Sequence, residues 1–124
     1  MGRGDRETSG VGDGEIDDSV FYALRNRHRR FTLYFLLEHE SVSVVELADV
    51  VAGWIRAGEY GMATRAERDG VYASLVHRHV PVLEEADLVE WSDDRETVSR
   101  TNWPVPVSEL VRLALTAETG EDES

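Results

Sequence analysis

The stretch Thr64–Trp91, TRAERDGVYASLVHRHVPVLEEADLVEW, determines how this chain folds. It begins with Thr64 and Glu67 at the spacing of a capping box, in which each side chain accepts a hydrogen bond from a backbone N–H at a helix start. Apolar residues then recur at helical spacing as far as Ala86, and the short β-prone run Val89–Trp91 follows. The sequence therefore predicts a helix that leads almost directly into a strand.

The two sides of this helix differ in character. Its core-facing side is expected to carry Tyr72, Leu75, Val76, His79, Leu83 and Ala86. The opposite side is small or polar, so we expect it to face solvent or a ligand. Pro81 lies within the helix and cannot donate a backbone hydrogen bond, which predicts a kink near His77.

Capping residues and apolar periodicity predict further elements before this helix. They are a short helix over Val20–Leu24 capped by Asp18 or Ser19, a core helix over Arg27–His39 capped by Asn26, a short strand at Ser41–Val42, and a helix over Val44–Ile55 opened by a Ser43/Glu46 capping box. Residues 56–63 contain two glycines and are expected to form a loop.

After this helix, the segment SDDRE joins Val89–Trp91 to Thr97–Ser99 and predicts a two-stranded wing. A last helix is expected over Glu109–Thr116, with Ser108 as its cap. The expected organisation is a disordered acidic N-terminal tail (1–18), a folded domain (19–101), a C-terminal helix that packs on the core or forms a dimer (102–116), and a disordered acidic tail (117–124).

This order of elements predicts a mainly α fold with a small β-wing, the winged helix-turn-helix. In such a domain the third long helix, here over Ala66–Ala86, typically enters the major groove of DNA. Fold alone does not decide function, so the functional prediction depends on the side chains that this helix exposes.

Composition excludes several classes of protein. The 124 residues contain no cysteine, which rules out disulfides, thiolate metal sites and cysteine nucleophiles. No run of about 18 apolar residues is present, so neither a transmembrane helix nor a signal peptide is expected, and a cytoplasmic location is predicted. Catalytic groups at a telling spacing and glycine-rich phosphate loops are also missing from the sequence, so neither an enzyme nor a bound cofactor is expected.

The charge is strongly negative, and the basic residues are all of one kind. The formal net charge is −12, and all 13 basic residues are arginine. This composition resembles that of proteins from salt-loving archaea; an acidic protein from a GC-rich genome is the alternative. Residues 1–18 carry two arginines against six carboxylates, and residues 116–124 carry four carboxylates and no base, so each segment has a net charge of −4. The folded part is therefore only mildly acidic, and a local basic face is possible.

Two segments, NRHRRFTLYFLLEHESVSVVELADVVA and RAERDGVYASLVHRHVPVLEEADLVEWSDDRETV, resemble a haloarchaeal winged helix-turn-helix family of uncharacterised function and, more distantly, ArsR-type repressors. The resemblance covers about Val20–Thr101, and VYASLVHRHVPVLEEADLVEW is its most specific part. It implies a winged helix and suggests transcriptional regulation. Asp87 stands where such proteins usually carry glycine before the wing strand, a position that often requires a positive φ.

The exposed side of the third long helix carries the first group of candidate DNA contacts. They are Thr64, Arg65, Arg68, Ser74, His77 and Arg78. Residues near the start of such a helix typically reach base edges, and arginine binds guanine O6 and N7 with two hydrogen bonds. The alternative is a solvated face whose arginines pair with Glu67 and Asp69. A basic face would favour DNA binding, and an acidic one would favour docking of a protein.

A second group lies where the core helix starts. It comprises Arg27, Arg29 and Arg30, beside Arg25 and His28. Helix N-termini attract anions, so these arginines are expected to contact phosphate. A helix also spreads such residues around its circumference, so only some share a face, and they can instead pair with carboxylates.

The wing and the histidines give weaker signals. Arg95 and Arg100 are candidates for contact with the DNA backbone or minor groove, but the acidic residues of the same SDDRE turn oppose such contact. His77 and His79 point about 200° apart on a helix, so they cannot chelate one ion together, and no metal site is expected.

The preferred hypothesis is a sequence-specific transcription regulator that binds double-stranded DNA through its third long helix. It is expected to act as a homodimer formed through the apolar C-terminal helix, without contact with a membrane. The alternative hypothesis is a winged-helix protein–protein interaction module that has lost DNA binding.

Overall fold

The computed structural model describes residues 16–57 and 62–120. Its elements are α1 (Asp18–Ala23), α2 (Arg27–Glu38), β2 (Ser41–Ser43), α3 (Val44–Ala57), α4 (Arg65–Ser74), η1 (Leu75–His79), α5 (Val80–Glu85), β3 (Val89–Trp91), β4 (Thr97–Arg100) and α6 (Val105–Thr119). The expectations for most of the N-terminal tail, the end of the C-terminal tail and the middle of the 56–63 loop lie outside the described residues. In the described ranges no helix is long and apolar enough to cross a membrane.

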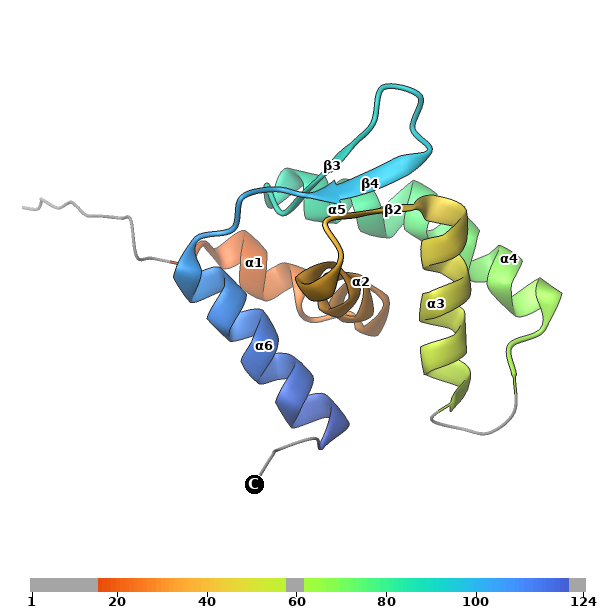
Figure 1. Cartoon of the computed structure of the whole chain (residues 1–124), viewed down its shortest axis with the longest axis horizontal. Helices are drawn as coiled ribbons and strands as arrows, with labels where there is room; N and C mark the ends of the chain where they lie inside the picture. The colour runs from red at the N-terminus through yellow and green to blue at the C-terminus, as the bar shows by residue number, and fades with distance from the viewer. Residues whose placement is uncertain (1–15, 58–61, 121–124) are drawn as a thin grey trace, which may run out of the picture.

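The central element is α2, which lies between α6 on one side and α3 on the other (Figure 1). A three-stranded antiparallel sheet in the order β2–β4–β3 lies along one side of these helices. Val98 of β4 stands opposite Val42 of β2 and Trp91 of β3. The fold is therefore mainly helical with a small wing formed by β3 and β4, the winged helix-turn-helix arrangement that the sequence predicts.

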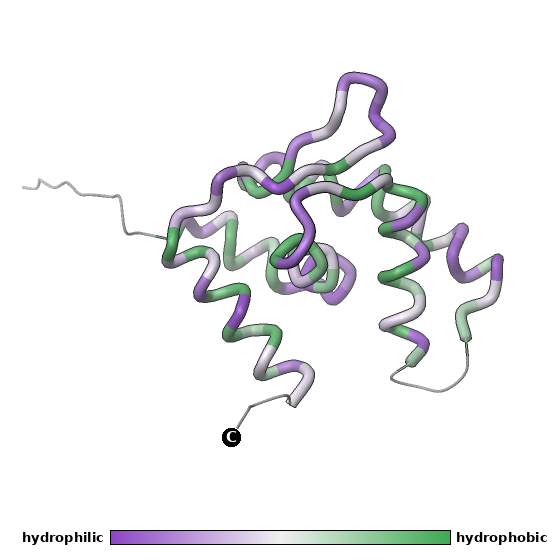
Figure 2. Tube along the Cα trace, in the orientation of Figure 1, coloured by the Kyte–Doolittle hydropathy of each residue, from purple (hydrophilic) through white to green (hydrophobic). Residues whose placement is uncertain are grey.

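Aliphatic side chains of the central helix and its neighbours form the core. Leu33 and Leu36 of α2 are fully buried and lie three positions apart, on one face of the helix. Leu47 and Val51 of α3 and Val111 of α6 belong to the same cluster and are equally inaccessible to solvent. The loop between β3 and β4 is hydrophilic, in contrast (Figure 2). The helices thus supply the packed body from which the wing extends.

Local capping motifs set the helix starts. The side chain of Asn26 caps α2 by accepting hydrogen bonds from backbone N–H groups, as expected. The capping box of Thr64 is complete at the start of α4. At α1 the expectation is corrected, because the cap is Asp17 rather than Asp18 or Ser19. The carboxylate of Asp17 accepts both the backbone N–H and the hydroxyl of Ser19, and so satisfies a helix-start donor.

The C-terminal helix is longer than the sequence predicts. α6 begins at Val105, about one turn before the expected start, and Ser108 therefore lies inside the helix rather than capping it. Pro106 lies in the first turn, where a missing N–H costs no intrahelical hydrogen bond. The helix continues to Thr119, so the expected disordered tail starts with helical residues. Gly120 ends it with a φ of 73°, a left-handed conformation suited to glycine.

The long helix predicted over Ala66–Ala86 consists of three consecutive pieces, α4, η1 and α5. The middle piece is a π-helical turn, in which the N–H of Val80 bonds to the carbonyl of Leu75, five residues earlier. This turn ends two residues before Pro81, whose missing N–H interrupts the ordinary hydrogen-bond pattern. The irregularity expected near His77 therefore takes the form of a π turn.

Asp87 connects α5 to β3 with a φ of 63°, the positive value that its position predicts. Glycine adopts this conformation without a Cβ penalty, whereas a β-branched residue is strained there. We expect Asp87→Gly to raise the free energy of unfolding by about 0.5 kcal/mol and Asp87→Val to lower it by about 1 kcal/mol. Urea denaturation followed by circular dichroism measures both. Both variants lose the same charge, so a glycine variant no more stable than the valine variant would refute the conformational explanation.

Candidate nucleic-acid interface

α4 is held mainly by α3, and none of its side chains is buried. The Nη1 of Arg68 donates to the carbonyl of Ala63 (2.9 Å), and its Nε pairs with Oδ1 of Asp49 on α3 (3.3 Å). A second ion pair joins Nη1 of Arg56 on α3 to Oε2 of Glu67 on α4 (3.3 Å). The helix is therefore clamped along one side and open along the other.

The open side of α4 carries small residues. Ala66 and Ala73 are exposed and lie two helical turns apart on one face of the helix, and the exposed Gly70 lies at the edge of that face, where it borders the cavity between α2, α3 and α4. A Cβ atom added to Gly70 would meet no other atom within 4 Å, so the space beside it is open. Because no long side chain stands on this stripe, the backbone of α4 is free to approach a partner closely.

Three of the predicted contacts are exposed and available. Arg65 lies in the first turn of α4, and His77 and Arg78 lie on η1. Among the described residues, none forms a hydrogen bond or ion pair with either arginine, and the same holds for the exposed carboxylate of Asp69. The exposed charge along α4 and η1 is therefore mixed, with two available guanidinium groups and one available carboxylate. It is neither the strongly basic face nor the acidic face that would decide the function by itself.

Two other predicted contacts, Ser74 and Arg68, do not lie on the open side. Ser74 is half-buried and lines a cavity of about 410 Å³ between α2, α3 and α4, together with Val71 and His28. Arg68 is turned toward the carboxylate of Asp49. The expectation of a single shared face is therefore wrong for these two side chains, because α3 flanks the side of α4 from which they project.

The prediction that Arg29 contacts phosphate is wrong, because this side chain is buried, with 6% of its surface exposed. Its Nε donates to the carbonyl of Ala23 (2.9 Å), and its Nη2 donates to the carbonyl of Tyr22 (3.2 Å). Its Nη1 donates to Nδ1 of His79 on η1 (3.2 Å). Arg29 therefore joins the end of α1, the start of α2 and the π turn.

The neighbouring arginines of this cluster differ in their partners. Arg30 makes a bidentate ion pair with Glu118 of α6 (2.7 and 2.9 Å) and donates to the carbonyl of Leu24 (2.9 Å), so it is not available to phosphate as predicted. Arg27 is exposed and makes no hydrogen bond or ion pair with a described residue. The helix thus spreads its three arginines around its circumference, and among them Arg27 stays available to an anion. Arg25, just before the helix, is also exposed, and its guanidinium lies over the ring of Tyr22 (5.6 Å).

The wing presents one arginine in an acidic turn. Arg95 is exposed at a φ of 60°, and its guanidinium lies over the ring of Trp91 (5.6 Å). Asp94 accepts hydrogen bonds from the hydroxyl of Ser92 and the N–H of Glu96, and these bonds hold the pKa of its carboxyl below the usual value. The carboxylate therefore stays charged beside Arg95, which opposes the predicted contact with phosphate.

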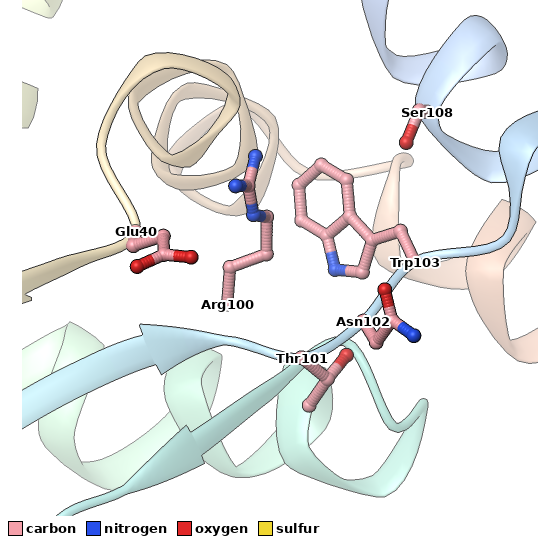
Figure 3. A pocket seen from close by; sticks show the side chains of 6 residues that line it. All are labelled: Glu40, Arg100, Thr101, Asn102, Trp103 and Ser108. Carbon is pink, nitrogen blue, oxygen red and sulfur yellow. The ribbon is translucent and has the colours of Figure 1, made fainter.

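Arg100, the other wing candidate, points into the body of the protein. Figure 3 shows its side chain between the end of α2 and Trp103, in a polar cavity of about 360 Å³. Its Nη1 donates to the carbonyls of Leu36 (2.9 Å) and Leu37 (3.2 Å), and its guanidinium lies over the Trp103 ring (5.6 Å). Those carbonyls end α2, so Arg100 serves as a structural cap rather than a DNA contact.

The two histidines beside Arg29 form a stacked pair. The rings of His28 and His79 lie 5.1 Å apart at 19°. Burial, the His28 ring and the charges of Arg29 and Arg78 lower the pKa of His79 to about 4, and burial with nearby arginines also lowers the pKa of His28. Both rings are therefore neutral near pH 7. In the part of the chain that the structure describes, no group of three or more potential metal ligands is gathered.

Sequence reasoning missed an apolar patch beside Arg65. Tyr72 was expected in the core but exposes 40% of its surface, and Val45 of α3 exposes 61%. Both line a shallow cavity of about 380 Å³ between α3 and α4, which Arg65 and Asp69 also border. The only sequence signal for this patch is the extra apolar residue at position 45, next to the stripe of α3. The patch adds apolar contact area to the candidate interface.

A family model described as "Domain of unknown function (DUF7344)" matches residues 21–99. The matched segment runs from α1 to β4 and therefore includes α3, α4, η1 and the wing, whereas α6 falls outside it. No curated protein and no solved structure matches the chain.

Proposed function

The chain belongs to this family of domains of unknown function, DUF7344, and we propose that it is a sequence-specific DNA-binding transcription regulator whose α4 enters the major groove. The observation that carries the proposal is the open side of α4, a helix that buries none of its residues in the core. Burial in the core contributes little to the stability of this helix, so its exposed side is available to a partner. Within this fold the commonest partner of such a helix is the major groove of DNA.

Size and side-chain chemistry support this placement. The major groove is about 12 Å wide, and an α-helix with its side chains measures about 10–12 Å across. The small residues Ala66, Gly70 and Ala73 permit the close approach that such a fit requires. Arg65 supplies a guanidinium for a guanine edge near the helix start, and Arg78 supplies another about 20 Å further along, at 1.5 Å per residue.

The acidity of the chain fits binding at high salt. We propose that the protein works in the cytoplasm of a salt-loving archaeon, because a lysine-free, acidic composition is typical of proteins from such organisms. The proposed distant relationship to ArsR-type repressors depends instead on the resemblance of the two quoted segments. At molar salt the screening length is about 3 Å, so distant carboxylates hardly repel DNA. Counterion release also contributes little there. Short-range arginine contacts and buried apolar area, such as that of Tyr72, then carry the affinity.

We infer that the DNA-binding form is a homodimer. α6 exposes Val105 (68%) and Leu113 (66%), and α1 exposes Phe21 (49%) and Tyr22 (51%). Pairing of such surfaces about a twofold axis would cover apolar area and present two α4 helices to two half-sites. Sedimentation in molar KCl measures the oligomeric state, and a monomer at all concentrations would refute this part of the proposal.

The DNA-binding proposal predicts a specific loss of affinity. A random duplex library is selected on the full-length protein in molar KCl, and the enriched duplex is titrated by fluorescence anisotropy. We expect micromolar or tighter binding, and the Arg65→Ala/Arg78→Ala variant should bind at least about tenfold more weakly, because one bidentate arginine–guanine contact is worth roughly 1–3 kcal/mol.

The matched control is Arg112→Ala, which removes an exposed arginine from α6, far from α4. Because α6 belongs to the proposed dimer surface, sedimentation in molar KCl first checks that this variant keeps the oligomeric state of the native protein. It should bind DNA as the native protein does, and circular dichroism should show the same helix content in both variants. Failure to enrich any sequence, or equal losses in the control and in the double variant, would refute recognition through α4.

The acidic wing turn favours a second candidate function, docking of a protein. Asp93, Asp94 and Glu96 are exposed at the tip of the hairpin, and this charge repels nucleic acid. If the wing is the recognition element, a basic partner protein should co-purify stoichiometrically without DNA. Replacement of the three carboxylates by amides should then release that partner and leave any DNA binding unchanged or strengthened.

A further inference from the structure

A cavity of about 520 Å³ opens where α2 meets the ends of α3 and α6, and we call it the aromatic pocket. Its apolar lining comprises Phe31, Tyr34, Trp54, Ile55, Ala57 and Leu115. The volume lies within the range of small-molecule sites, about 300–1,000 Å³. No residue of α4 lines it, so the aromatic pocket is separate from the candidate DNA interface.

The aromatic side chains of the pocket hold one another in place. The rings of Phe31 and Trp54 meet edge to face, with centroids 5.8 Å apart and planes at 87°, and the ring centroid of Tyr34 lies 5.8 Å from that of Phe31. Trp54 nevertheless exposes 42% of its surface. Large aromatic rings are therefore preorganised beside unfilled space, and a planar apolar ligand would cover them with little loss of conformational freedom.

The one carboxylate that lines the pocket is already paired with an arginine. Glu118 receives two hydrogen bonds from Arg30 (2.7 and 2.9 Å) and one from the hydroxyl of Tyr34 (2.8 Å). The bonds from Arg30 hold the pKa of Glu118 below its usual value, while burial and Glu118 raise the pKa of the Tyr34 hydroxyl. Glu118 thus stays charged but is fully occupied, so it has little capacity to bind a cationic ligand.

Arg27 is the charged group at the pocket that has capacity left. It lines the cavity one helical turn before Phe31, is exposed, and makes no hydrogen bond or ion pair with a described residue, although its charge contributes to the lowered pKa of Glu118. With Arg30 paired to Glu118, the guanidinium of Arg27 gives the pocket an excess positive charge. A ligand with a negative group beside an apolar ring would match both features.

We propose that the aromatic pocket binds a small aromatic anion, a carboxylate or sulfonate whose ring packs against Phe31 and Trp54 and whose negative group pairs with Arg27. Binding itself does not depend on the proposed DNA-binding function. A regulatory consequence does, because α3 lines this pocket through Trp54 and also clamps α4 through Asp49 and Arg56. A ligand at the end of α3 would therefore act on the position of α4.

The test uses two fluorescent probes that differ in charge, anilinonaphthalenesulfonate and the uncharged N-phenylnaphthylamine, titrated into the full-length protein. We expect both to bind the native protein and Arg27→Gln to weaken binding of the sulfonate roughly tenfold, the effect of losing one charge-assisted hydrogen bond. Binding of the uncharged probe should change less than about twofold. Ala57→Trp places an indole ring in the cavity from the exposed end of α3. It should therefore weaken the binding of both probes.

The control Arg112→Gln removes one exposed arginine from α6 away from the pocket, so it should leave both affinities unchanged. Equal sulfonate affinity in the Arg27 and Arg112 variants would overturn the proposal, as would native affinity in the Ala57 variant or the failure of both probes to bind. If the probes bind as expected but the protein binds no DNA, the ligand site is confirmed and the proposed effect of the ligand on DNA binding is refuted.

Discussion

Replacing Arg29 with glutamine is expected to lower the free energy of unfolding by about 3 kcal/mol, because it leaves buried hydrogen-bond acceptors unpaired. The guanidinium donates to the carbonyls of Ala23 and Tyr22 and to Nδ1 of His79, at 2.9 to 3.2 Å. A glutamine side chain is shorter, has a single N–H₂ group and cannot reach all three. Urea denaturation at fixed high KCl, followed by circular dichroism, measures the loss.

The control for this prediction is Arg27→Gln, two positions earlier on the same helix. Arg27 is exposed and makes no hydrogen bond or ion pair with a described residue, so its replacement should change the free energy of unfolding by less than about 0.5 kcal/mol. If the two variants unfold at the same urea concentration, Arg29 is not the structural link between α1, α2 and η1 that its contacts indicate.

The different fates of these two arginines illustrate where sequence reasoning was limited. The cluster looks like one basic patch in the sequence, but Arg29 precedes Leu33 by four positions and Leu36 by seven, so it lies on the buried face of α2. That periodicity was visible beforehand. The hydrogen-bond acceptors of Arg29 could not be predicted in this way. The carbonyl of Ala23 and the ring of His79 belong to other elements, and only the folded structure brings them next to Arg29.

Some short-range features were predictable because they depend on residues close together in the sequence. The caps at Asn26 and Thr64 each depend on neighbours within a few positions, so the local sequence predicts them. The positive φ of Asp87 was predicted from the family resemblance instead, and the caps expected for α1 and α6 were wrong. The order of helices and the wing followed from such signals together with apolar periodicity. The fold class was therefore within reach of the sequence.

The side assignments on α4 failed because the π turn changes the helical phase. In the π turn the hydrogen bond spans five residues instead of four. The side chains of α4 are therefore rotated about the helix axis relative to those of α5. Ordinary helical spacing predicts Tyr72 on the same core-facing side as Leu83, whereas the structure exposes Tyr72 and turns Val71 and Ser74 toward α3. Pro81 predicted an irregularity, but a proline does not by itself reveal which hydrogen-bond register the chain adopts.

Acidification from pH 7 to about 4.5 is expected to lower the free energy of unfolding by about 2 kcal/mol through His79. Burial and nearby positive charge lower the pKa of His79 to about 4 in the folded protein, against a model value of 6.5. The unfolded state therefore binds the extra proton first. The stabilisation is complete above about pH 6.5 and is lost as the pH falls toward 4. Protonation also turns the Nδ1 acceptor into a donor that faces Arg29.

Two variants isolate this effect in the same urea experiment. His79→Gln keeps an oxygen that accepts from Arg29 but removes the titration of His79, so its stability should depend less on pH between 7 and 4.5. The dependence that remains includes that of His28, whose pKa burial also lowers. His39→Gln removes an exposed histidine and should retain the native pH dependence. Glu118 and Asp94 have lowered pKa values, so their contributions to the free energy of unfolding are lost mainly below pH 4.5. An unchanged pH dependence in His79→Gln would show that the destabilising proton binds elsewhere.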